Sequence, residues 1–298
     1  MKRSFIIFIL FLLSIPLLSW AEAKKANLIF YDQIVKPGEK VYIMARLRKG
    51  LISVKPEISG ERVEFFRLTA NSYQLSAKDK ELKSLGIALT GTDGTAVKEI
   101  PPLKAGFHRF SARLPDTKRY SAEESQGLVA CWDPKRPIIV VDIDGTVSNT
   151  DNSELLFKKK DTDPKPLKDA PEVLRRLSKN HNIIFLTHRN ELLLDKTRQW
   201  LKENKFPTAP VFILGLGEDP TTSGDYENEK IEEWKKEGWN LKIGIGNKAN
   251  DAEVYLENRM KAIIIGDEDD LPDKTIRVKN WKEIEKIILS TGPFGKNP

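Results

Sequence analysis

The spacing of hydrophobic positions changes near residue 135. Before that point, short apolar or alternating runs are separated by Gly, Pro, Asn and Asp, which is typical of strands joined by turns. Their spacing predicts an antiparallel β-sandwich over residues 24–132. The expected strands are residues 27–31, 41–46, 63–68, 86–89 and 106–113.

After residue 135, nearly all-apolar runs alternate with segments of helical periodicity. This alternation predicts an α/β domain over residues 133–298, with a five-stranded parallel sheet in a three-layer, Rossmann-like arrangement. In such sheets, ligands bind at the carboxyl ends of the strands where the strand order reverses. Strands are expected at 137–144, 182–187, 211–214, 241–246 and 262–266, and helices at 170–179, 191–203, 227–236, 251–260 and 281–290.

Residues 1–23 form a separate segment. Lys2 and Arg3 precede an apolar run that contains Pro16, and the run ends in Ala21-Glu22-Ala23. A basic start, an apolar centre and a small-x-small ending predict a secretory signal peptide. The alternative is an uncleaved membrane anchor, because the run approaches the roughly 17 to 25 residues that a spanning helix needs. Once the signal is removed, no span is expected.

Composition adds limits to this picture. A chain of 298 residues with 40% hydrophobic residues can bury full cores, which excludes disordered and fibrous classes. The single Cys, Cys131, cannot form an internal disulfide. Export without disulfides indicates a bacterial periplasm or exterior. The net charge of +6 comes from well-mixed charges, so it gives little support to nucleic acid or anionic lipid as a partner.

The first α/β strand ends in Asp142-Ile143-Asp144-Gly145-Thr146. Because side chains alternate along a strand, both carboxylates point to one side at its carboxyl end, and Gly145 lets the chain turn away. Two such acids repel each other unless a cation or phosphate chemistry uses them. A single Asp in a strand-to-loop turn is common, but this motif directly after Ile138-Ile139-Val140-Val141 is rare by chance.

This motif resembles the first motif of the haloacid-dehalogenase superfamily of phosphatases. The resemblance implies that Asp142 is the nucleophile and forms an aspartyl-phosphate. It implies that Asp144 is the general acid that protonates the leaving oxygen and then the base that activates water. Gly145 and Thr146, in the turn that follows, are expected to contact the substrate.

The remaining motifs of the superfamily have counterparts further along the chain. Thr187 ends the second strand and would hold a phosphoryl oxygen, and Lys230 corresponds to the lysine that neutralises the transferred group. The fourth strand ends in Gly246-Asn247-Lys248-Ala249-Asn250-Asp251, which is similar to Gly-Asp-x-x-x-Asp. The resemblance implies Mg²⁺ as cofactor. Its expected ligands are Asp142, the Asp144 carbonyl, Asn247 and Asp251.

Several of these residues also have ordinary structural explanations. Lys230 lies in a helix whose surface is rich in Lys, and Asp251 suits the N-cap of a helix. His188 and Arg189 follow Thr187 and are expected to touch the substrate head group. A lone His in a loop, however, more often makes only local hydrogen bonds.

Two stretches narrow the resemblance within the superfamily. They are Asp142-Ile143-Asp144-Gly145-Thr146-Val147-Ser148-Asn149-Thr150-Asp151 and Gly246-Asn247-Lys248-Ala249-Asn250-Asp251-Ala252-Glu253-Val254-Tyr255. Both are similar to motifs of lipin-type phosphatidate phosphatases and of the related C-terminal domain of phosphatidylinositol transfer proteins. Thr197-Arg198-x-Trp200-Leu201 and Lys230-Ile231-Glu232 extend the match. The sequence Thr187-His188-Arg189-Asn190 differs from the Ser-Ala-Arg-like motif of that family. This loop is expected to face the substrate, so the difference bears on which lipid head group the site accepts.

A looser resemblance concerns the N-terminal part. The run Leu89-Thr90-Gly91-Thr92-Asp93-Gly94-Thr95-Ala96, followed by Leu103-Lys104-Ala105-Gly106-Phe107-His108, resembles bacterial immunoglobulin-like modules. This resemblance implies an immunoglobulin-like sandwich. The sequence names no ligand for it, so its expected role is that of a spacer, a partner-binding domain or a substrate-presenting domain.

The spacing of the motifs favours a bulky substrate. The segments from Thr146 to Thr187 and from Thr187 to Lys230 are each used up by one helix and one strand, which leaves no room for a large cap domain. The leading hypothesis is an exported Mg²⁺-dependent phosphatase acting on phosphatidate or a related lipid at a membrane surface. Alternatives are a polynucleotide end, a phosphoprotein or a soluble ester as substrate. A lipid-binding or adhesion module with a vestigial site is a further alternative, although the transfer-protein relatives lack the acid/base Asp that is present here as Asp144.

Overall fold

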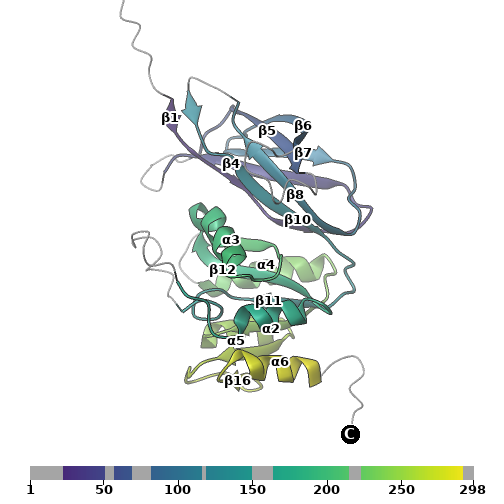
Figure 1. Cartoon of the computed structure of the whole chain (residues 1–298), viewed down its shortest axis with the longest axis vertical. Helices are drawn as coiled ribbons and strands as arrows, with labels where there is room; N and C mark the ends of the chain where they lie inside the picture. The colour runs from purple at the N-terminus through teal and green to yellow at the C-terminus, as the bar shows by residue number, and fades with distance from the viewer. Residues whose placement is uncertain are drawn as a thin grey trace, which may run out of the picture.

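The computed structural model describes residues 23–50, 57–68, 82–115, 119–149, 164–214 and 223–290. The predicted signal peptide therefore lies outside the described residues, except for Ala23. A β-rich N-terminal part lies above an α/β C-terminal part in Figure 1. Among the helices described, none combines the length and apolar character that crossing a membrane requires.

The N-terminal part is a sandwich of two sheets. Its strands are β1 (Lys24–Lys25), β2 (Asn27–Phe30), β3 (Gln33–Val35), β4 (Val41–Arg48), β5 (Arg62–Leu68), β6 (Leu82–Leu89), β7 (Thr95–Ile100), β8 (Gly106–Arg113), β9 (Tyr120–Ser121) and β10 (Ser125–Cys131). One sheet has the order β3-β10-β8-β5-β6 and the other β2-β4-β7, while β1 pairs with β9. Buried side chains of both sheets form one core, including Phe30, Ile43, Phe65 and Phe110.

All five strands expected in this part are present, and most pairs are antiparallel as predicted. The pairs β10–β3 and β1–β9 are parallel, which corrects the expectation of a wholly antiparallel arrangement. Sequence spacing did not indicate β10, whose residues include small ones. One of these, Gly127, is required by packing, because a Cβ there would lie 2.0 Å from the Phe30 ring.

The C-terminal part contains a parallel sheet of six strands, not the predicted five. Its order is β13-β12-β11-β14-β15-β16, and every pair is parallel. The extra strand, β16, has only three residues, too few to show a hydrophobic period. The strands are β11 (Ile138–Val141), β12 (Asn182–Asn190), β13 (Val211–Leu214), β14 (Leu241–Gly246), β15 (Lys261–Ile265) and β16 (Ile276–Val278).

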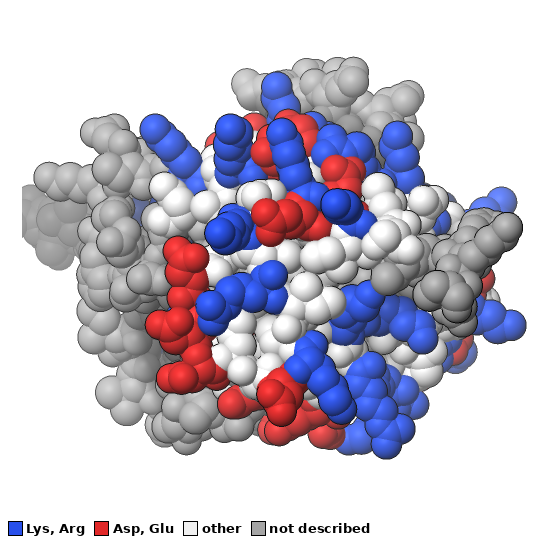
Figure 2. Space-filling view, turned by 90° about the horizontal axis from the view of Figure 1, so that it is seen from below, with Lys and Arg blue, Asp and Glu red and all other residues white. Residues whose placement is uncertain are grey.

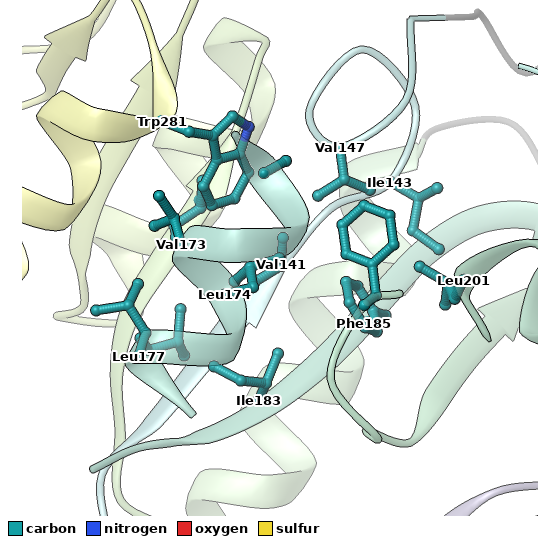
Figure 3. Close-up of a cluster of buried hydrophobic side chains, with 14 of the residues drawn as sticks. Val141, Ile143, Val147, Val173, Leu174, Leu177, Ile183, Phe185, Leu201 and Trp281 are labelled. Carbon is teal, nitrogen blue, oxygen red and sulfur yellow. The ribbon is translucent and has the colours of Figure 1, made fainter. Parts of the chain in front are cut away.

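Helices cover both faces of this sheet. They are α2 (Ala170–Leu177), α3 (Leu194–Glu203), α4 (Ser223–Lys236), α5 (Ala249–Glu257) and α6 (Trp281–Ser290), and the 3₁₀ turn η2 (Glu191–Leu193) precedes α3. Figure 3 shows the core on one face, where Leu174 and Leu177 of α2 and Trp281 of α6 pack against Val141 and Phe185 of the sheet. On the other face, α4 and α5 contribute Ile231, Trp234 and Tyr255 to a second core. The helices expected from the sequence are therefore present, and three layers form as predicted.

The strand order reverses beside β11. From this strand the chain proceeds to β12 and β13 on one side, and then returns to place β14, β15 and β16 on the other. The carboxyl ends of β11 and β14 therefore meet at the switch point of the sheet. This is the position at which open α/β sheets bind ligands.

Candidate active site

The segment after β11 is held in a tight turn. The backbone amides of Val147 and Ser148 both donate to the carbonyl of Ile143 at 3.0 Å, and Gly145 has φ +76°. Such a φ is strained for residues with a Cβ. The indole of Trp281, from α6, donates to the carbonyl of Thr146 at 3.0 Å. The turn is thus fixed by its own backbone and by a buried side chain of the core.

Asp142 lies at the centre of the candidate site. Its side chain is only 8% exposed, and the Thr146 hydroxyl donates to its Oδ2 at 2.8 Å. Burial raises the pKa of the Asp142 carboxyl well above its usual value, and the charges of Asp251 and Asp144 raise it further. The hydrogen bond from Thr146 acts in the opposite direction. The negative charges in this site therefore oppose one another when no cation or substrate is bound.

Asn247 and Asp251 come from the segment that follows β14. The backbone amides of Asn247 and Lys248 donate to Asp251 Oδ2 at 2.8 and 3.0 Å, at the start of α5. Asn247 Oδ1 lies 3.3 Å from the Thr146 hydroxyl. Asp251 thus stabilises the start of α5 from the third position of the helix, whereas the N-cap is Lys248. Its charge also acts on Asp142.

These residues fit a Mg²⁺ ion. Burial raises the pKa of Asp251, and Asp251 in turn raises the pKa of Asp142, so a divalent cation would relieve charge that the protein alone leaves uncompensated. Within the described ranges, no group of three or more His, Cys, Asp or Glu side chains is placed to hold a metal by itself. Mg²⁺ binds few carboxylates and keeps water and phosphate oxygens, so two Asp residues, an amide oxygen and a carbonyl suit it.

Asp144 is engaged by Arg189. The guanidinium donates from Nε to Oδ2 at 2.8 Å and from Nη2 to Oδ1 at 2.7 Å, and from Nη1 to the Thr197 hydroxyl at 3.1 Å. Arg189 is 2% exposed. The sequence indicated Arg189 as a residue that contacts the substrate, whereas in the structure it pairs with the expected acid/base residue.

Thr187 and His188 lie within β12, which runs further than the predicted strand. The Thr187 hydroxyl is buried and accepts from the Arg189 amide at 3.4 Å. His188 Nε2 is buried without a hydrogen-bond partner in the described structure. Burial lowers the pKa of the His188 imidazole, and the nearby charge of Lys248 lowers it further. The charge of Lys248, in the fourth motif, therefore acts on His188.

Lys230 does not pair with the carboxylates of the site. Its ammonium donates to Glu233 at 2.7 Å on α4, and its side chain is 31% exposed. The ordinary explanation of a Lys on a helix surface thus describes the arrangement seen here.

Two charged residues that the sequence analysis did not assign a role lie at the site. Glu227 of α4 is 3% exposed, and its Oε2 has no hydrogen-bond partner in the described residues. Burial raises the pKa of Glu227 well above its usual value, as do Asp142 and Asp251, while Lys248 lowers it. Lys248 also lowers the pKa of Asp251. Besides Arg189, Lys248 is therefore a cation whose charge acts on the carboxylates of the site. Its position directly after Asn247 is the feature of the sequence that could have indicated it.

Comparisons with known proteins bear on this part of the chain. The family model described as "PITM 1-3, LNS2 domain" matches residues 139–265. No curated protein matches the chain. Among solved structures, D,D-heptose 1.7-bisphosphate phosphatase from B. bronchiseptica, complexed with magnesium and phosphate, has 14% identity and a TM-score of 0.41, covering 52% of this chain and 99% of its own. The PKD domain (329–428) from human KIAA0319 has 13% identity and a TM-score of 0.22, covering 37% of this chain and 84% of its own.

The family match coincides with the site. It begins within β11, ends with β15, and contains Asp142, Asp144, Thr187, Lys230 and Asp251. This segment is the part of the chain that is similar to the LNS2 domain of the PITM proteins.

Proposed function

We propose that this chain is an exported, Mg²⁺-dependent phosphatase that acts on phosphatidate or a related phospholipid monoester through an aspartyl-phosphate. The observation that carries the proposal is the buried Asp142 beside Thr146, Asn247 and Asp251 at the switch point of a parallel sheet. The match of the LNS2 family model to the same segment supports it.

In the first step, a carboxylate oxygen of Asp142 attacks phosphorus and the bond to the alcohol oxygen breaks. Asp144 would give its proton to that oxygen, so the products are a neutral alcohol and the phosphorylated Asp142. To carry a proton, Asp144 must release at least one of the two hydrogen bonds that Arg189 donates to it. Arg189 is then free to donate to a phosphoryl oxygen of the substrate.

In the second step, Asp144 accepts a proton from a water molecule, and the water oxygen attacks the phosphorus of the aspartyl-phosphate. Cleavage of the bond to Asp142 returns the carboxylate and releases inorganic phosphate. Lys248 would offset the negative charge of the transferred group. Asp142, Asp251, Asn247 and the Asp144 carbonyl would hold Mg²⁺, which would supply further positive charge there. Lys230, assigned this role by resemblance, would first have to leave Glu233.

The lipid substrate class rests on the absence of a large cap insertion and on the family similarity. In the described segments, β11, α2, β12, α3, β13 and α4 follow one another with no further domain between them. Figure 2 shows small groups of Lys and Arg separated by Asp and Glu on the face seen from below. This face therefore shows no continuous basic surface of the kind that a polynucleotide binds.

A comparison of substrates tests the proposal. The purified mature protein should release phosphate from phosphatidate in mixed micelles faster than from an oligonucleotide 3′-phosphate, a phosphopeptide or a soluble ester. Asp142→Asn should abolish release, and Asp273→Asn, an exposed Asp outside the site, should not change it. Activity retained in Asp142→Asn would rule out the nucleophile, and preference for another ester would rule out the lipid.

The proposed export has its own test. Residues 1–23 carry the signal features, so the protein recovered from the exterior or periplasm should begin after Ala23. N-terminal sequencing decides between this outcome and an uncleaved anchor, in which Met1 or Lys2 would be retained in the membrane fraction.

A second candidate function is a phosphate-binding or lipid-binding module without turnover. The observation that favours it is the bidentate pairing of Arg189 with Asp144, which occupies both oxygens of the expected acid. A protein that binds phosphatidate vesicles, releases no phosphate and is unaffected by EDTA would support this candidate.

A further inference from the structure

The contact between the two parts of the chain contains a fully buried charge. The side chain of Glu191, which opens η2, has no exposed area. Its Oε1 is bonded by Nη1 of Arg48, and its Oε2 by the hydroxyl of Tyr31. Arg46 Nη1 lies 3.8 Å from the same Oε2. All three partners belong to the β-sandwich, and Arg48 is itself only 3% exposed.

A buried carboxylate is stable only where it is paired and hydrogen-bonded, because removing an isolated charge from water is strongly unfavourable. The C-terminal domain supplies none of the cationic partners seen here. The position of Glu191 is therefore set by β4 of the sandwich.

Glu191 is connected to the candidate site through a very short segment. Arg189, two residues earlier in the chain, donates two hydrogen bonds to the carboxylate of Asp144. Between them, Asn190 accepts from the Leu192 amide at 3.0 Å, and the pairing with β13 shifts register between Thr187 and Asn190. The backbone pairing between β12 and β13 is irregular at Arg189. The side-chain contacts of Arg189 and of Glu191, on either side of Asn190, therefore fix the path of the backbone through this segment.

A second polar group joins the domains through the buried carboxylate of Asp32. Arg198 of α3 donates to the carbonyls of Phe30 and Gln126 at 2.7 and 2.6 Å, and to Asp32 Oδ1 at 2.7 Å. Asp32 also accepts from the amide of Val211 at 2.8 Å. Both polar groups therefore cross the contact between the two parts, and of the two carboxylates Glu191 is the one that lies within two residues of Arg189.

From this geometry we infer that the β-sandwich is part of the active-site framework. Arg48 and Glu191 are positioning residues, which hold the segment of Arg189 and through it the carboxylate of Asp144. The inference rests on the proposed function, because it assigns the second domain a task in the same reaction. It differs from the role of a spacer, for which substitutions in β4 would leave catalysis unchanged.

Kinetics of Arg48→Gln, Glu191→Gln and the double variant test the inference. Each single change should lower kcat for phosphatidate by about ten- to a hundredfold, the effect expected when a catalytic group shifts by about 1 Å. KM should change less than kcat, because the substrate contacts other than that of Arg189 remain. The double variant should lose no more than either single one, since both act through one pair. The double variant also removes the charges of Arg48 and Glu191 together. It therefore leaves neither member of the pair buried without its partner, and it should fold even if a single variant does not.

Asp32→Asn is the matched control. It alters a buried carboxylate that pairs with Arg198 across the same domain contact. Arg198 follows Thr197, which accepts from Arg189 Nη1, but the Asp32–Arg198 pair holds neither the guanidinium bonds to Asp144 nor the segment from Arg189 to Glu191. This variant should lower the melting temperature and leave kcat unchanged. An equal loss of kcat in Asp32→Asn would show a general effect of domain docking and would overturn the specific role of Arg48 and Glu191.

A spectroscopic measurement separates this inference from the proposed function. The ¹H–¹⁵N signal of Arg189 Nε, assigned by its loss in Arg189→Lys, reports the hydrogen bond to Asp144 without requiring turnover. It should shift or broaden in Arg48→Gln and Glu191→Gln and stay unchanged in Asp32→Asn. If the protein releases no phosphate, the proposed function fails while this signal still decides the inference. An unchanged signal in folded Arg48→Gln overturns it.

Discussion

Asn247 lies directly over Gly145. A Cβ added to Gly145 would come within 2.2 Å of Asn247 Nδ2 and 2.8 Å of its Cγ. The two residues belong to segments about a hundred positions apart, and they meet because β11 and β14 are neighbours in the sheet. The side-chain amide of Asn247, in the fourth motif, therefore packs against the turn at Gly145 in the first motif.

Gly145→Ala is therefore expected to lower both activity and stability. The φ of +76° costs a residue with a Cβ about 1 to 2 kcal/mol, and displacement of Asn247 adds to this. Gly60→Ala is the control, because Gly60 has the same φ of +76° with nothing within 4 Å of its added Cβ. Urea unfolding and phosphate release should show a smaller stability loss and full activity in Gly60→Ala. Equal behaviour of the two variants would contradict the role of the contact.

Lys248→Gln is expected to reduce kcat more than Lys230→Gln. Lys248 interacts with Glu227 and Asp251, whereas Lys230 pairs with Glu233 at the surface. Removal of a preorganised positive group at the phosphoryl site typically costs about a hundredfold or more in kcat. The measurement is steady-state phosphate release at saturating Mg²⁺. The reverse order would indicate that Lys230 leaves Glu233 and enters the site when substrate binds.

The motif positions could be predicted because they follow from strand ends. Asp142 and Asp251 are at one edge of the sheet for the reason the sequence supplied: both follow apolar strands that proved to be adjacent and parallel. β16 escaped prediction because a strand of three residues has no measurable period.

Charged residues with partners in the other domain could not be predicted. Glu191 and Arg48 resemble ordinary surface charges in the sequence, because nothing local indicates that a distant strand buries them together. The same applies to Arg189, whose spacing from Thr187 predicted a substrate contact but not its pairing with Asp144. Lys230 was assigned by resemblance to the third motif, which does not predict that its ammonium pairs with Glu233 in the structure.

Asp251→Asn should separate the capping role of Asp251 from metal binding. An Asn side chain still accepts the amides of Asn247 and Lys248, so the start of α5 stays capped, but the negative charge is lost. The Mg²⁺ concentration for half-maximal activity should rise about tenfold or more, since loss of even an outer partner of a metal ligand has that effect. Asp251→Ala should in addition lose about 1 kcal/mol of stability through the missing cap. If Asp251→Asn responds to Mg²⁺ like the unaltered protein, Asp251 is a cap alone.

Asp142→Asn should stabilise the metal-free protein, and increasingly so as the pH rises. Burial raises the pKa of Asp142 above its usual 3.8, so above that pH the unfolded chain ionises this group while the folded protein retains the proton. Folding then requires proton uptake, and the stability of the unaltered protein falls by up to about 1.4 kcal/mol per pH unit until the folded pKa is passed. Thermal melts in EDTA from about pH 4 to 8 should show a difference that grows from near zero. Mg²⁺ should reduce or reverse it, because the ion favours the ionised carboxylate. A difference that is constant across this range would show that the Asp142 charge does not oppose folding.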